Sequence, residues 1–188
     1  MPKKTKKKDL PIAVTLHVPT SGLADSGARS ATVTGALREP SSVDAGRYDL
    51  IPPEALAAAA CAPVPANRNE AELWLANALA VGQLSGIASF IAYLVASELG
   101  GWHRIAVHYA RGALKYADRN WEKGLETGRT VSSLYRHLDK AKRGLVDEDH
   151  WAAAAWNAIA IYDHTRRLQL GRLPRELDTY GVLARRGS

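Results

Sequence analysis

The sequence predicts an all-α protein, a helical bundle with a long irregular N-terminal arm. Three observations support this class. Apolar residues recur at helical spacing in several segments, and no alternation of strands with helices appears along the chain. Of the 188 residues, 46% are hydrophobic and 23% charged, a globular composition. We expect a basic tail at 1–20, one all-α domain at 21–170 and a C-terminal tail at 171–188.

The positive charge is concentrated at the N-terminus. Met1–Lys8 contains five lysines and no acid, so it carries most of the net charge of +6. Such a cluster either contacts nucleic acid or anionic lipid, or serves as a solvated leader. The single cysteine, Cys61, excludes an intrachain disulfide framework and a multi-cysteine zinc site, and it fits a cytoplasmic protein.

The first half of the chain contains a long loop and then its most apolar segment. Residues 21–48 are rich in small and polar residues, which predicts an arm that could lie across a binding site. A helix follows at Pro53–Cys61. Glu70–Leu99 contains no charge from Leu73 to Ser97, a length that would span a bilayer. Interspersed polar residues argue against a membrane span and favour a buried hairpin or an oligomer-contact helix.

The segment from Trp102 to Gly124 predicts a two-faced helix followed by a polar loop. One stripe at helical spacing is apolar and aromatic (Ile105, Tyr109, Gly112, Tyr116), and the adjacent stripe is basic (Arg104, His108, Arg111, Lys115). After Tyr116 the periodicity ends, and acids, cations, an amide and an indole follow within eight residues. Binding groups are often found on such loops, although a solvated helix face with a turn has the same pattern.

Two further helices are expected at Thr130–Arg143 and Glu148–Arg167. We expect Asp147 to cap the second of them. The acids at 147–149 either hold a divalent metal or serve only in capping. His150, Asn157 and His164 share one stripe, where they either orient a base or water or form ordinary hydrogen bonds.

Three blocks carry a family resemblance: RYDLIPPEAL (47–56), RGALKYADRNWEKG (111–124) and RHLDKAKRGLVDEDHWAAAAWN (136–157). Together they resemble the N-terminal domain family of phage dATP/dGTP diphosphohydrolases. The resemblance implies an all-α, MazG-like pyrophosphohydrolase that cleaves a purine deoxynucleoside triphosphate with a divalent metal, Mg²⁺ or Mn²⁺. Residues 61–101 appear as a helical insertion between two of the blocks. A homo-oligomer in the host cytoplasm is also expected.

The acids and cations in these blocks lead to a set of candidate site residues. The expected catalytic residues are Glu122, His150 and Asn157, and the expected metal ligands are Glu122, Glu148 and Asp149. The expected substrate-binding residues are Arg47, Lys115, Tyr116, Arg119, Asn120, Trp121, Arg136 and His137. Two other functions remain open: a non-catalytic module that binds nucleotides or nucleic acid through the lysine tail and basic stripes, and a membrane-associated protein using Leu73–Ser97.

Overall fold

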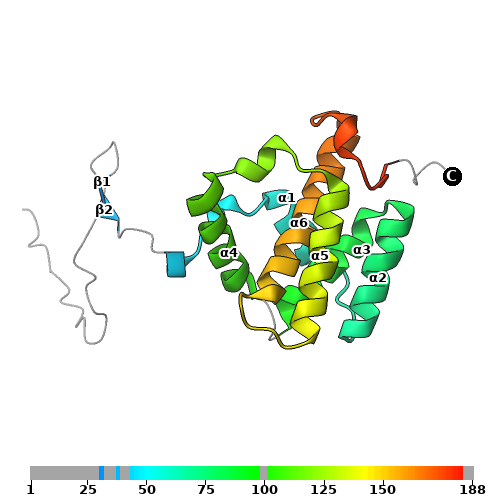
Figure 1. The fold of residues 1–188 in the computed structure, drawn as a ribbon, viewed down its shortest axis with the longest axis horizontal. Coiled ribbons are helices and arrows are strands. Elements are labelled where there is room, and N and C mark those ends of the chain that lie inside the picture. The colour runs from blue at the N-terminus through cyan, green and yellow to red at the C-terminus, as the bar shows by residue number, and fades with distance from the viewer. Residues whose placement is uncertain (1–29, 32–36, 39–42, 98–100, 184–188) are drawn as a thin grey trace, which may run out of the picture. The chain divides into compact units, whose positions relative to one another are not determined.

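The structure, a computed structural model, describes residues 30–31, 37–38, 43–97 and 101–183 (Figure 1). The chain divides into two units, Met1–Pro40 and Ser41–Ser188. In the first unit β1 (Ser30–Ala31) and β2 (Leu37–Arg38) form an antiparallel pair. The predicted tail at 1–20 lies outside the described residues, and the predicted domain boundaries remain predictions.

The second unit is built of helices, which confirms the predicted all-α class. Its α-helices are α1 (Pro53–Cys61), α2 (Arg68–Val81), α3 (Leu84–Ala96), α4 (Gly101–Tyr116), α5 (Thr127–Lys142) and α6 (His150–Gln169). Among the described residues of this unit, four short 3₁₀ helices accompany them: η1 (Val43–Ala45), η2 (Tyr48–Leu50), η3 (Asn120–Lys123) and η4 (Arg175–Leu177).

Helix α6 is the central element of this unit. It packs against α1, α3, α4 and α5, and Figure 1 shows α5 running alongside it. Ala152–Ala155 and Ala158 are almost fully buried along its length. Because alanine adds little volume beyond the backbone, neighbouring helices can approach α6 closely on several sides. The first residue of α6, His150, is thereby buried at the end of the bundle.

The long apolar segment forms a helical hairpin. Gly82 ends α2 with a φ of 68°, a left-handed conformation that suits glycine, and α3 begins two residues later. Helices α2 and α3 pack against each other, and α3 packs on α6. A Cβ at Gly86 would lie 2.7 Å from the Ala78 Cβ and 2.8 Å from the Trp74 carbonyl oxygen. Glycine at position 86 therefore allows the backbones of α2 and α3 to pack this closely.

Among the described residues, no single helix is both long and apolar enough to cross a membrane. Helices α3 and α4 meet the length and composition criteria only when taken together, and they are bent by 103° relative to each other.

Gly86→Ala should destabilise the bundle by about 1–3 kcal/mol, because the added methyl must displace backbone and Ala78. Gly112→Ala is the matched control, since a Cβ there meets nothing within 4 Å in the middle of α4. It should stabilise the protein by up to about 1 kcal/mol through helix propensity. Urea unfolding of both variants measures the difference, and equal effects would contradict the close α2–α3 contact.

The cap of α6 differs from the prediction. Asp149, not Asp147, occupies the N-cap, and its carboxylate accepts a hydrogen bond from the Ala152 backbone N–H at 3.0 Å. Asp147 instead contacts His150 and Lys140. Both acids lie just before α6, so their positions in the sequence do not distinguish the cap. Their contacts with other helices decide which one caps α6.

The C-terminal segment is held against the start of α5. The Asp178 carboxylate accepts hydrogen bonds from the backbone N–H groups of Val182 and Leu183, both at 2.9 Å. The Thr127 hydroxyl accepts one from the Tyr180 backbone N–H at 2.9 Å. These contacts order the segment through residue 183, beyond the short helix η4.

Candidate functional site

Helix α4 has the two faces that its sequence predicts. Ile105 and Tyr109 are buried, with exposed fractions of 0% and 3%. Along the adjacent face, Arg104, His108 and Arg111 line hollows in the surface. One face of α4 therefore anchors it to the bundle while the other is available to a ligand.

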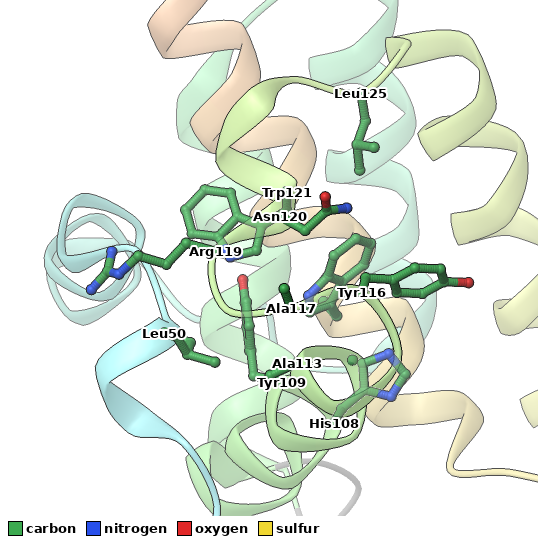
Figure 2. Close-up of a pocket in the computed structure, with 12 residues that line it drawn as sticks. Leu50, His108, Tyr109, Ala113, Tyr116, Ala117, Arg119, Asn120, Trp121 and Leu125 are labelled. Carbon is green, nitrogen blue, oxygen red and sulfur yellow. The ribbon is translucent and has the colours of Figure 1, made fainter.

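An aromatic pocket of about 370 Å³ lies where α4 and the following loop meet α6 (Figure 2). The Tyr109 ring stands edge-on to Trp121, with ring centroids 6.2 Å apart and an angle of 73° between the planes. The Trp156 ring from α6 lies 6.1 Å from Tyr109. We call this space the aromatic pocket; its lining is Leu50, His108, Tyr109, Gly112, Ala113, Tyr116, Ala117, Arg119, Asn120, Trp121, Leu125 and Trp156.

The loop after α4 is shaped to bring Trp121 into this pocket. Ala117 and Arg119 both have positive φ angles, 73° and 55°, which non-glycine residues adopt only rarely. His164 Nε2 donates a hydrogen bond to the Trp121 carbonyl oxygen at 3.0 Å, from inside the bundle. Trp121 is consequently 7% exposed and fixed in place. Strained backbone that is held by such contacts is often found at binding sites.

A second, smaller hollow of about 220 Å³ adjoins the same face of α4. It is lined by His103, Arg104, Val107, His108, Arg111 and Asp149, and we call it the cationic hollow. Arg104 makes two 2.6 Å hydrogen bonds to the Asp149 carboxylate, which tie α4 to the start of α6. Arg111 is exposed and belongs to the lining of this hollow, so its guanidinium is accessible to an anion.

His108 lines both spaces and is the residue they share. Its ring lies 6.1 Å from that of Trp156. Burial lowers the pKa of His108, and the nearby positive charge of Arg111 acts in the same direction, while Glu148 and Asp149 oppose them. Since the ordinary histidine pKa is about 6.5, His108 is neutral at pH 7 and can accept a proton.

A cluster of two histidines and a glutamate, the His–Glu cluster, lies where α5, the connecting loop and the start of α6 meet. His137 comes from α5, Glu148 from the connecting loop, and His150 is the first residue of α6. One ligand atom from each lies within 4.8 Å of the other two, and no other group of three or more potential metal ligands occurs in the part of the chain that the structure describes. This is a possible metal site.

Asp147 supports the cluster from outside. Its carboxylate lies 2.7 Å from His150 Nε2 and 3.0 Å from the Lys140 ammonium. Lys140, and then His150, hold the pKa of Asp147 at about 2. Asp147 is therefore ionised at neutral pH and accepts a hydrogen bond from the outer nitrogen of His150.

Several of the predicted phosphate-binding cations are engaged elsewhere. Arg47 pairs with Asp49 and Asp118, at 2.8 Å in each case. Arg119 pairs with Glu122 and donates to the Asp49 carbonyl oxygen, and Figure 2 shows its guanidinium pointing away from the aromatic rings. These pairs hold the loop against η2.

The remaining predicted cations are exposed on the surface. Lys115 is fully exposed, with its ammonium 5.0 Å from the Tyr116 ring. Arg136 is also exposed and donates to the Ser133 hydroxyl at 3.1 Å. Neither lines the aromatic pocket or the cationic hollow.

The three predicted metal ligands do not form one group. Glu148 lies with His137 and His150, Asp149 pairs with Arg104, and Glu122 pairs with Arg119. Asn157, a predicted catalytic residue, is 3% exposed and donates to the Ala153 carbonyl oxygen within α6. The catalytic, substrate and metal assignments remain predictions.

The structure brings the 102–124 segment and the 136–157 segment, which carry most of the predicted site residues, into contact. Arg104–Asp149 and His108–Trp156 contacts join α4 to the 136–157 segment. Three of the predicted substrate-binding residues, Tyr116, Asn120 and Trp121, line the aromatic pocket. The site residues predicted from the sequence omit His108, Arg111 and Trp156, although the basic stripe on α4 contains the first two.

The fold and these spaces define an all-α protein whose surface can accept a ligand with an aromatic part and an anionic part. Residues 98–171 match the family model described as dATP/dGTP diphosphohydrolase, N-terminal, which confirms the predicted resemblance over that segment. The match covers less than half of the chain. It includes the second and third blocks of the resemblance, whereas 47–56 lies outside it. No curated protein and no solved structure shows significant similarity to the chain.

Proposed function

We propose that this protein hydrolyses a purine deoxynucleoside triphosphate, dATP or dGTP, to the monophosphate and pyrophosphate. The observation that carries the proposal is that the aromatic pocket and the cationic hollow adjoin at His108. A nucleotide has the matching chemistry, a flat base at one end and a polyanion at the other. The matched family name supports the same reaction class.

The base would occupy the aromatic pocket. Aromatic side chains bind bases by stacking, which contributes about 1–3 kcal/mol per base. Trp156 and Tyr109 supply ring faces and edges, and Trp121 is fixed beside them. The amide of Asn120 also lines the pocket and offers both a donor and an acceptor to a base edge. A pocket of this size and lining is typical of small-molecule sites.

The triphosphate would occupy the cationic hollow. Arg111 is accessible there, and Arg104 is held in place by Asp149. Guanidinium groups bind phosphate oxygens through short, charge-assisted hydrogen bonds. His103 adds a further donor at the rim. These groups come from successive turns of one rigid helix, so their spacing is maintained without a ligand.

A divalent ion, Mg²⁺ or Mn²⁺, would accompany the phosphate chain. Such ions are commonly held by one or two carboxylates together with substrate phosphates. Asp149 lines the cationic hollow at the start of α6 and acts electrostatically on His108, so its carboxylate would be the one offered to this ion. When bound, the ion neutralises phosphate charge and orients the chain for attack.

His108 would accept the proton in the chemical step. Release of pyrophosphate requires water to attack the α-phosphorus, forming one P–O bond while the bond to the bridging oxygen breaks. The attacking water loses a proton, and the pyrophosphate leaves with the electron pair of the broken bond. His108 is neutral at pH 7 and lies between the base and phosphate spaces. It is therefore better situated than the buried Asn157 to orient that water.

Purified full-length protein incubated with each of the four dNTPs and with Mg²⁺ or Mn²⁺ tests the proposal. We expect dATP or dGTP to yield the monophosphate and pyrophosphate, separated by anion-exchange chromatography, with little turnover of dCTP and dTTP. Affinity for dATP without any product would instead indicate a non-catalytic nucleotide-binding protein. If the protein neither binds any dNTP nor forms product, both functions are refuted.

A further inference from the structure

The ligand atoms of the His–Glu cluster form a nearly equilateral triangle. His137 Nδ1 and His150 Nδ1 are 3.2 Å apart, and Glu148 Oε1 lies 3.3 Å from the first and 3.4 Å from the second. The three residues come from α5, from the loop and from α6, so the folded bundle assembles the triangle. The His150 side chain is 1% exposed and that of His137 is 12% exposed.

The size of the triangle matches a tetrahedral metal site. Ligand atoms at 2.0–2.1 Å from a tetrahedral ion are separated by about 3.3–3.4 Å, whereas an octahedral Mg²⁺ with the same bond lengths needs about 2.8–3.0 Å. The three separations lie closer to the tetrahedral value than to the octahedral one, so the triangle suits a shared tetrahedral ion.

The contact between His150 Nε2 and the Asp147 carboxylate orients the His150 ring for metal binding. Its Nε2 donates a hydrogen bond at 2.7 Å to the Asp147 carboxylate, which favours the tautomer that carries its lone pair on Nδ1. Lys140 in turn fixes the second oxygen of Asp147 at 3.0 Å. Metal-binding histidines usually donate their other N–H to a carboxylate in this manner, and the contact sets ring orientation and basicity.

We propose that His137 Nδ1, His150 Nδ1 and Glu148 Oε1 form a resident Zn²⁺ site, with Asp147 as its positioning residue. Two imidazoles and one carboxylate favour Zn²⁺ over Mg²⁺, which prefers oxygen ligands. Three protein ligands leave one coordination position for an exogenous ligand. The proposal rests on this geometry alone and is separate from the Mg²⁺ or Mn²⁺ that would accompany a nucleotide.

Metal binding to the full-length protein tests the site directly. Chelator-treated protein is titrated with Zn²⁺ by calorimetry, and with Co²⁺ while visible absorption is recorded, since tetrahedral Co²⁺ absorbs strongly. We expect one Zn²⁺ per chain, which excess Mg²⁺ does not displace, and a tetrahedral Co²⁺ spectrum. His137→Gln and Glu148→Gln should each abolish the spectrum. Asp147→Asn should weaken Zn²⁺ affinity about 10–100-fold.

Asp139→Asn is the matched control for Asp147→Asn. Asp139 is an exposed acid on the adjoining helix, paired with Arg143 and not with the cluster, so its replacement should leave Zn²⁺ affinity unchanged. Circular dichroism establishes that each variant is folded, and the partly exposed Glu148 provides a variant that spares the core. Absence of Zn²⁺ binding, or wild-type affinity in both His137→Gln and Glu148→Gln, would overturn the proposal. The dNTP panel is independent, so failure of either hypothesis leaves the other testable.

Discussion

Replacing His108 with alanine should lower kcat for dATP hydrolysis about 10²–10⁴-fold, the usual contribution of a positioned general base. His108 lines both the aromatic pocket and the cationic hollow. Removal of the imidazole leaves the attacking water without a proton acceptor, while most substrate contacts remain. We therefore expect KM to change far less than kcat, as measured by initial rates over a range of dATP concentrations.

Added imidazole provides the control for this variant. The alanine substitution opens space between the two hollows, so free imidazole should restore part of kcat in His108→Ala and have no effect on the wild-type protein. A structural defect would not be rescued in this way. A kcat within a few-fold of wild type would show that His108 does not accept the proton.

Trp156→Leu should weaken binding of both dATP and deoxyadenosine about 10–100-fold, because the stacking surface of one aromatic ring is lost. Trp151→Leu is the matched control, an identical change on α6 at a residue that contacts Arg68 and does not line the pocket. Equilibrium dialysis of both ligands measures the effect. Equal losses in the two variants would point to general destabilisation and contradict a base site at Trp156.

Arg111→Gln separates the two halves of the proposed site. It should weaken dATP binding about 10-fold and leave deoxyadenosine binding unchanged, because charge-assisted hydrogen bonds to phosphate are lost while the base contacts remain. The same dialysis experiment measures both ligands. A parallel loss for deoxyadenosine would mean that Arg111 contacts the base or supports the fold.

The helices were predictable because local periodicity determines them. The stripes on α4 place Ile105 and Tyr109 in the core and Arg104 and His108 on the adjacent, pocket-lining face, as spacing alone indicates. The end of α4 at Tyr116 was likewise visible in the loss of periodicity. The break at Gly82 was harder to assign, because a continuous apolar run suits one long helix as well as a hairpin.

Contacts between helices account for what the sequence did not reveal. His137 and His150 are 13 residues apart on different helices, so no single-helix spacing connects them. Asp147 was expected to cap α6, but Asp149 occupies the N-cap and pairs with Arg104, while Asp147 pairs with His150. Similarly, Arg47 and Arg119 have the charge for phosphate binding, and only the folded chain pairs them with Asp49, Asp118 and Glu122.

Photo-cross-linking with 8-azido-dATP tests the location of the site most directly. The azide is attached to the base, so irradiation should label the aromatic pocket, and peptide mapping should find the label at Tyr109, Trp121 or Trp156. Unlabelled dATP should prevent this labelling, and dCTP should compete poorly. Labelling confined to Met1–Lys8 or to helices α1–α3, or labelling that dATP does not reduce, would contradict a purine nucleotide site between α4 and α6.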